Sequence, residues 1–170
     1  MYRTIGSGIT PNASGLTLLA TATPSAATVV TFNSIPTGYK NLYLVWKNVT
    51  GTLNAFAMIR LNNSTTGHTF YGTSGSGTGD FGIGASGSVQ WGFGDLTLPI
   101  QQGYGNFTVF DYSNTVEGKS CYWNSRGGSS STVTWGFFNS ATPVSRIDII
   151  PSTNYSPFVV SGKFFLYGVI

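Results

Sequence analysis

Few side chains of this sequence could perform acid–base or nucleophilic chemistry. His68 is the only histidine among 170 residues, and the five acids are spread over the chain: Asp80, Asp95, Asp111, Glu117 and Asp148. A Ser–His–acid triad would have to use His68, and no Gly-x-Ser-x-Gly turn presents a serine to it. We interpret His68 as a solvated or hydrogen-bonded residue of a polar loop that leads into a strand. The sequence therefore predicts a protein that is not an enzyme.

The acids mark neither a carboxylate pair nor a metal site. A glycosidase needs two carboxylates roughly 5–10 Å apart, and separate strands could bring two together, but nothing singles out a pair. Asp111 and Asp148 fall in predicted strands, where we expect pairing across the sheet with Arg146 or a lysine. Calcium would need clustered ligands such as Asp-x-Asp-x-Asp. Cys121 is the only cysteine, which leaves no internal disulfide and no Cys-based metal centre.

Two glycine patterns imitate nucleotide-binding motifs. Residues 77–82 and 82–87 both match Gly-x-Gly-x-x-Gly. In the dinucleotide fingerprint the last glycine opens a helix that holds the pyrophosphate, whereas residues 88–93 have the pattern of a strand. Asp80-Phe81-Gly82 matches a kinase tripeptide, yet the lysine strand and catalytic loop that belong with it are missing. We expect no cofactor.

Charge is scarce, which bears on the partners. Only 8% of residues are charged, against about 25% in an ordinary domain, and this removes a usual guard against association. We therefore favour a subunit that sits against others. The basic residues are scattered, so we expect no nucleic-acid binding. No run approaches the roughly 20 apolar residues of a membrane span, and no signal-peptide core follows Met1, so we expect synthesis in the cytoplasm.

The elements that would position these side chains are strands almost throughout. Hydrophobicity alternates with period two, and β-branched and aromatic residues fill runs bounded by Gly, Pro, Asn and Ser. No window has the spacing of an amphipathic helix. The predicted strands cover residues 27–32, 41–49, 55–62, 89–93, 96–100, 106–112, 120–124, 132–138, 146–150 and 164–169.

This pattern predicts an all-β fold, an antiparallel β-sandwich that is jelly-roll-like. We expect residues 1–16 to form an extended N-terminal arm, disordered or docked on a neighbour, and residues 17–170 to form a single sandwich domain. The stretch 72–94 is glycine-rich, and we predict a flexible loop over residues 72–88. Long loops in compact domains are often functional, so this loop is expected to contact a partner.

Aromatic residues in or beside predicted loops are the remaining candidates for a contact surface. Their rings could stack on sugars while neighbouring Asn, Ser and Thr side chains bond hydroxyl groups; we favour packing in the core or against another subunit. The candidate partner-contact residues are Phe70, Tyr71, Phe81, Trp91 and Tyr104.

Two segments carry a resemblance to a known group. The first is residues 18–36, ending in Ser-Ile-Pro, followed by Tyr39 and Asn41-Leu-Tyr-Leu; the second is residues 146–170, which close in Leu-Tyr-Gly-Val-Ile. Together with Ile59-Arg-Leu-Asn-Asn, they resemble virion proteins of tailed bacteriophages. The resemblance implies a β-sandwich of the phage particle, either a capsid-decorating (cement) protein or part of a tail fibre or adhesin.

The resulting expectation is a non-enzymatic structural protein on the virion surface. We expect a capsid-decorating subunit, assembled as a homotrimer, that stabilises the head by contacting the major capsid protein or other virion subunits. The N-terminal arm and residues 72–94 would make these contacts. The alternative is a tail-fibre or adhesin domain that binds host-surface glycans through Phe81 and Trp91.

Overall fold

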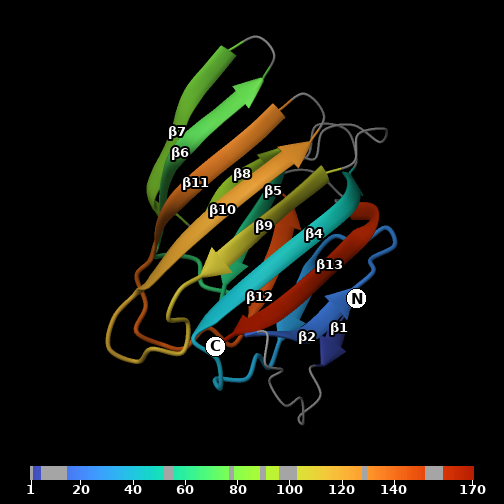
Figure 1. Cartoon of the computed structure of the whole chain (residues 1–170). Coiled ribbons are helices and arrows are strands. Elements are labelled where there is room, and N and C mark those ends of the chain that lie inside the picture. Colours follow the sequence, from blue (N-terminus) through green and yellow to red (C-terminus); the bar gives the residue numbers. More distant parts are fainter. Residues whose placement is uncertain are drawn as a thin grey trace.

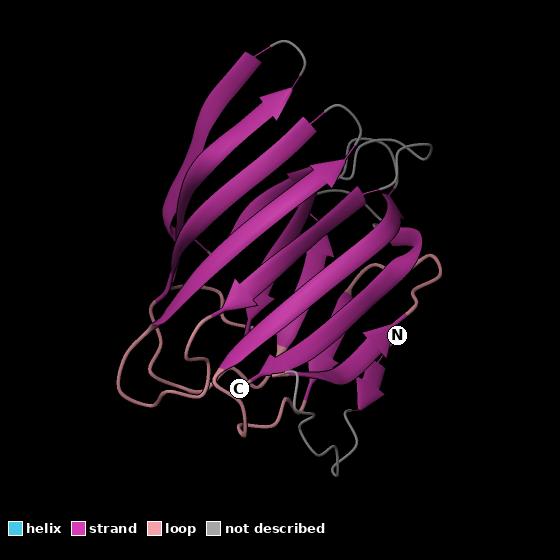
Figure 2. Ribbon diagram, viewed as in Figure 1, coloured by secondary structure: helices cyan, strands magenta, loops and turns pink. Residues whose placement is uncertain are grey.

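The computed structural model describes residues 2–4, 15–51, 56–76, 79–88, 91–95, 103–127, 130–151 and 159–170. Within these ranges every regular element is a β-strand (Figure 2). Over the same residues, no helix has the length and apolar character needed to cross a membrane.

The strands form two sheets that lie face to face (Figure 1). The larger has eight strands in the order β2 (Leu16–Ala22), β13 (Val159–Val169), β4 (Asn41–Gly51), β9 (Gly103–Val109), β10 (Lys119–Gly127), β11 (Ser130–Phe138), β6 (His68–Ser76) and β7 (Gly79–Ser88). The smaller has five in the order β1 (Tyr2–Thr4), β3 (Val30–Asn33), β12 (Ile147–Pro151), β5 (Phe56–Leu61) and β8 (Trp91–Asp95). Neighbours are antiparallel apart from β1 and β3, which are parallel. The prediction of an all-β antiparallel sandwich is confirmed.

The core lies between the sheets and follows from the alternation. In β4, Leu42 and Leu44 are fully buried, whereas Tyr43 between them is half-buried on the opposite face. Aromatic rings fill the centre: Trp46 and Trp123 have centroids 4.8 Å apart, and Phe107 lies 6.1 Å from Trp123. Residues of the smaller sheet close the core from the other side, among them Phe32, Ile59 and Ile147. Aliphatic and aromatic burial of this kind is the main favourable term in folding.

The glycine-rich loop predicted over residues 72–88 is wrong. Residues 68–76 and 79–88 form the hairpin strands β6 and β7, and β6 also pairs with β11. Glycine has no side chain to display a period of two, yet its backbone groups form ladder hydrogen bonds like any other. The close approach of the strands even requires glycine at one point, because a Cβ on Gly72 would lie 2.0 Å from the Val133 carbonyl oxygen.

The N-terminal arm predicted over residues 1–16 also differs from the structure where the residues are described. Tyr2–Thr4 is strand β1, which pairs with β3 at the edge of the smaller sheet, and Leu16 opens β2 in the larger one. The described part of the arm therefore docks on its own chain. The intervening residues 5–14 lie outside the described part, as does the strand predicted over residues 96–100.

The larger sheet is wider than the smaller. In Figure 1, β6 and β7 lie at the upper left and extend beyond the five-stranded sheet. The smaller sheet reaches β10, β11 and β6 mainly through β8. The outer face of the larger sheet, which points away from the smaller sheet, is thus a broad and gently twisted surface.

Candidate functional site

His68 is a core residue and has no catalytic setting. It opens β6, is fully buried, and its Nε2 accepts a hydrogen bond of 3.2 Å from the Leu61 main-chain N–H. An accepting Nε2 carries no proton, so the ring is the neutral Nδ1–H tautomer. The ring stacks on Phe138 at a centroid distance of 4.7 Å. The hydrogen bonding expected for His68 is present, but the prediction of a loop position is wrong because β6 begins there.

Asp148 is buried, and its carboxylate accepts hydrogen bonds from two side chains. It is 2% exposed and accepts from Thr31 Oγ1 at 2.7 Å and from Arg146 Nε at 2.8 and 2.9 Å. The expected partner Arg146 is confirmed, although it stands two residues away on the same side of the chain rather than across the sheet. The cross-strand partner is Thr31, which faces Asp148 in the register of β3 and β12.

Asp111 was predicted in a strand and lies instead in the turn after β9. It is exposed, its φ is +46°, and its main-chain N–H donates to Asn41 Oδ1 at 3.0 Å. It lines a polar depression of about 360 Å³ together with Lys40, Ser113, Asn114 and Thr115. This depression holds a single carboxylate, so it does not offer the acid pair of a glycosidase.

Two further side chains that could react, Lys119 and Cys121, are buried in the structure. The Lys119 ammonium donates to the carbonyl oxygens of Asn114, Ser140 and Glu117, at 2.7, 2.7 and 3.0 Å. Its burial lowers its pKa from the ordinary value. Cys121 is also buried, which raises its pKa well above the usual range and keeps the thiol protonated. Among the residues that the structure describes, no three His, Cys, Asp or Glu side chains could together hold a metal ion.

The outer face of the eight-stranded sheet carries a line of aromatic side chains that is not part of the core. The residues that stand opposite one another across successive strands place five aromatic side chains in one line, which we call the aromatic row: Tyr167, Tyr43, Tyr122, Trp135 and Tyr71. Thr108 of β9 occupies the one position between Tyr43 and Tyr122 that lacks a ring. With strands spaced roughly 4.8 Å apart, the row is about 24 Å long.

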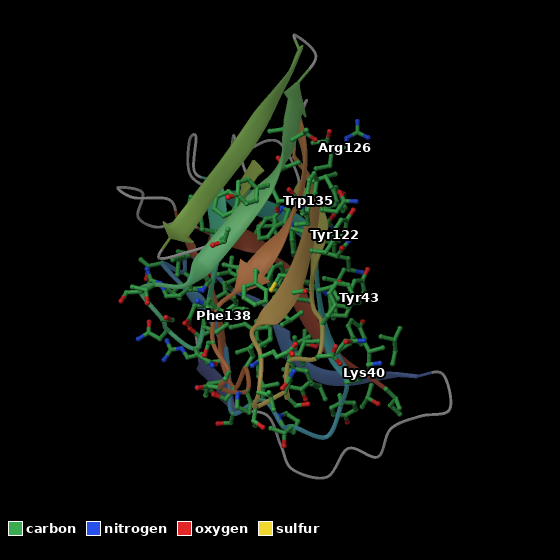
Figure 3. The ribbon with its side chains drawn as sticks, turned by 90° about the vertical axis from the view of Figure 1, so that its left-hand side faces the viewer. Lys40, Tyr43, Tyr122, Arg126, Trp135 and Phe138 are labelled. Atoms are coloured by element: carbon green, nitrogen blue, oxygen red, sulfur yellow. The ribbon has the colours of Figure 1, made fainter. Side chains whose placement is uncertain are left out.

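The rings of the row are open to solvent to different degrees. Trp135 and Tyr71 are each 53% exposed, and the other three are half-buried. Tyr43 and Tyr167 contact each other with centroids 6.4 Å apart. Figure 3 views the sheet from its edge: Tyr43 and Tyr122 lie on its outer side, and Phe138 lies on the side that faces the smaller sheet. At the far end the Tyr71 ring lies over β7, because a Cβ on Gly84 would come within 2.8 Å of Tyr71 Cδ1.

The surroundings of the row are uncharged and mix polar with apolar side chains. The apolar ones are Phe165, Val45 and Val133 on one side, Phe110 and Phe137 on the other, and Leu18 opposite Tyr167 at the end of the row. The polar neighbours stand two residues from the row along their strands. On one side these are Asn106, Asn124 and Thr73, of which Asn106 and Asn124 face each other in register. On the other side they are Ser120 and Thr69. The six strands from β13 to β6 contain no Asp or Glu at all.

Among the described strands of this face, the exposed cations stand at one margin, while Lys40 lies in the loop at the opposite end. Lys163, Lys47 and Arg126 each lie four residues from a member of the row, a distance of about 13 Å along the strands. Lys47 Nζ also lies 5.3 Å from the centre of the Phe165 ring, a cation–π contact.

The candidate contact residues do not form one site. Tyr71 belongs to the aromatic row, and Tyr104 is 46% exposed on the same face, opposite Arg126. Phe70 is 2% exposed and packs in the core, so its selection as a contact residue is wrong. Phe81 pairs with Ser74 in the β6–β7 hairpin and Trp91 with Ile59 in the smaller sheet; the side chains of both lie outside the described part.

Four members of the row were missed because they were taken as ordinary strand residues. The alternation could have indicated their position. Tyr43, Tyr122 and Trp135 each stand next to a buried residue in a strand, so their own side chains point to the opposite face of the sheet.

Comparison with known proteins adds no family to this description. No family model, no curated protein and no solved structure matches the chain. The resemblance to tailed-phage virion proteins therefore stays a prediction.

Proposed function

We propose that this protein is a non-enzymatic surface subunit of a tailed-phage particle, most simply a capsid-decorating protein that works by presenting surfaces for contact. The observation that carries the proposal is the contrast between interior and surface. His68, Asp148, Lys119 and Cys121 are all buried and engaged in holding the fold. The wide outer face of the larger sheet, in contrast, is built of exposed rings, aliphatic groups, amides and hydroxyls.

We further propose that the fold is a jelly roll widened by two additions. The strands β2, β13, β4 and β9 would form one half and β3, β12, β5 and β8 the other, which is supported by their order in the two sheets. The β6–β7 hairpin and the β10–β11 pair would then be insertions that widen only the larger sheet. Their effect is to enlarge the outer face without adding to the smaller sheet.

Attachment to neighbouring subunits is assigned to the β6–β7 end. Strand β7 is the last strand of the larger sheet, and its outer edge has no neighbouring strand among the described residues. An open edge offers unpaired backbone groups to another chain. We propose that this edge contacts the capsid or a second copy of the protein, and that the assembled form is a trimer.

The test is an assembly and attachment experiment. The purified chain should run as a trimer in light scattering coupled to gel filtration, and it should co-sediment with heads of the phage that encodes it. Ile83→Pro, on β7, should reduce both, whereas Val116→Ala in an exposed turn should not. A monomer that fails to sediment with heads contradicts the proposal.

A second function, glycan recognition by a tail fibre or adhesin, is favoured by a separate observation. Exposed aromatic rings flanked by amide and hydroxyl groups are suited to stacking on sugars and bonding their hydroxyls. The aromatic row provides both. A glycan array probed with the purified protein tests this function, and an array without any signal would count against it.

A further inference from the structure

The spacing of the aromatic row limits the shape of what it could bind. Trp135 stands opposite Tyr122 on one side and opposite Tyr71 on the other, so three rings occupy three adjacent strands. The strands repeat roughly every 4.8 Å, which is close to the length of one pyranose unit in an extended chain. A polymer that crosses the strands could therefore place successive sugars over successive rings. Thr108 interrupts the line of rings between Tyr122 and Tyr43, and its side chain offers a hydroxyl group at that position.

The form of the surface also favours a chain over a single sugar. The polar depression described above lies at the loop end of the sheet, around Lys40 and Asp111, and not on the row. The row runs over about 24 Å of sheet surface. A flat line of rings of this length gives a single sugar contact with one ring but gives a chain contact with several.

The charge around the row determines the chemistry of the chain. The residues that flank it are uncharged, such as Asn106, Asn124 and Thr73, and the strands that carry it contain no carboxylate. The basic residues Lys47 and Arg126 begin about 13 Å away along their strands, and Lys47 Nζ reaches back as far as the Phe165 ring beside the row. Neither the row nor the positions two residues from it along these strands hold a charged residue, so an uncharged chain fits the row best.

Two other polymers fit less well. Single-stranded nucleic acid also stacks on rings, but it needs cations that follow its backbone, and here no basic residue stands in the row. A protein partner would be favoured by an apolar centre with few polar groups. Here apolar neighbours such as Phe137 and Val133 are interspersed with amide and hydroxyl side chains along both sides of the row.

We infer that the aromatic row is a binding site for a neutral, extended polysaccharide that lies across the strands, with Trp135 and Tyr71 as its main contacts. This inference deepens the glycan-recognition function proposed above. It applies equally to a subunit on the head or on the tail.

The experiment is affinity electrophoresis of the purified full chain in native gels that contain one polysaccharide each. The neutral probes are hydroxyethyl cellulose, glucomannan and galactan; alginate is the acidic probe, and an oligothymidylate is the nucleic-acid probe. We expect retardation by at least one neutral polysaccharide, with little change on adding salt because no ion pairs are involved. Intrinsic fluorescence should report the same binding through Trp135, the most exposed tryptophan among those whose side chains are described.

Variants test the location of the site. Trp135→Ala and Tyr71→Ala should each weaken binding by about tenfold or more, as truncation of an aromatic contact residue does. Trp135→Phe keeps a ring and should retain most of the affinity. Tyr104→Ala is the matched control: Tyr104 is exposed on the same face but outside the row, and its loss should leave binding unchanged. Thermal midpoints close to that of the parent protein exclude unfolding as the cause.

Three results would overturn the inference: no retardation by any neutral polysaccharide, equal loss of binding in Tyr104→Ala, or binding only to alginate or oligothymidylate that disappears with salt. None of these bears on attachment to phage heads. Co-sedimentation of the Trp135→Ala variant with heads would keep the decorating function even if the polysaccharide site were disproved, and so the two proposals can fail separately.

Discussion

The two faces of the eight-stranded sheet are built from neighbouring residues of the same strands and have opposite roles. Trp123 on the inner face is 1% exposed and packs against Trp46 and Phe107. Tyr122, the residue before it, stands on the outer face between Trp135 and Thr108. Both faces are rich in aromatic residues, so composition does not distinguish them. What distinguishes them is the five-stranded sheet, which covers one face and leaves the other in contact with water.

The contrast between the two faces gives a way to recognise a functional surface. A buried aromatic ring is explained by the stability it adds, since it removes roughly 150–250 Å² from water. An exposed row of rings adds little stability and raises the risk of aggregation, so it calls for another explanation. The following changes test whether the two faces differ in this way.

The largest effect is expected from the centre of the inner face. Trp123→Ala should lower the free energy of unfolding by about 3–5 kcal/mol, because it leaves a cavity beside Trp46 and Phe107. It also removes the donor to Ser125 Oγ. Urea unfolding followed by circular dichroism measures the loss. A loss below about 1 kcal/mol, within the range of ordinary surface changes, would mean that the inner face is not the core.

The buried ammonium of Lys119 should have the next largest effect. Lys119→Met keeps most of the side-chain volume but leaves three carbonyl oxygens without their donor, so we expect a loss of about 2–3 kcal/mol. The matched control is Lys163→Met, since Lys163 is exposed at the margin of the outer face. Equal stability of the two variants in urea would show that the carbonyl groups do not depend on the ammonium.

Tyr112 gives a smaller effect that depends on pH. Its hydroxyl donates to the Pro36 carbonyl oxygen, and burial raises its pKa above the ordinary value of 10.0. Below pH 10 both folded and unfolded chains keep this proton. As the pH rises above 10, the unfolded chain ionises first, and the stability contributed by Tyr112 is lost as the pH passes through the folded pKa.

The variant Tyr112→Phe isolates this contribution from those of Lys119 and Cys121. At pH 8 it should be less stable than the parent by about 1 kcal/mol, for the lost hydrogen bond. The gap should narrow when urea midpoints are compared at pH 9, 10 and 11. A gap that stays constant over this range would mean that the phenol does not titrate differently in the two states.

The smallest effect is expected on the outer face. Tyr71→Ser and Trp135→Ser should each change the free energy of unfolding by no more than about 0.5 kcal/mol, because both rings are more than half exposed. Thermal unfolding measures this. A loss of stability comparable to that of Trp123→Ala would show that the row belongs to the structural core. The claim that the two faces have different roles would then be wrong.

Much of the fold could be predicted because alternation is a local property. The run over residues 41–49 lies within β4, and those over 120–124 and 132–138 lie within β10 and β11. The prediction failed at the β6–β7 hairpin, where seven glycines between positions 72 and 88 hide the period. It failed again at His68, because the residues before it are polar and typical of a loop. The ring is nevertheless buried, since it stacks on Phe138 and accepts a hydrogen bond from the Leu61 N–H.

The candidate site was less predictable for a different reason. Tyr43, Tyr122, Trp135 and Tyr71 are far apart in the chain, and only the register between strands aligns them. Register is a long-range property, and a slip of one residue in any pair would send a ring to the other face.

The order of the residues is enough to predict that this chain forms strands, that few of its side chains suit acid–base chemistry, and that aromatic residues occupy both phases of the alternation. Which phase is covered, and which strands are neighbours, follows from the packing of the two sheets. Hydrophobicity is encoded residue by residue, whereas exposure depends on which other segment packs against a residue and excludes water. For Trp123 that segment is the five-stranded sheet; over Trp135 none lies among the described residues.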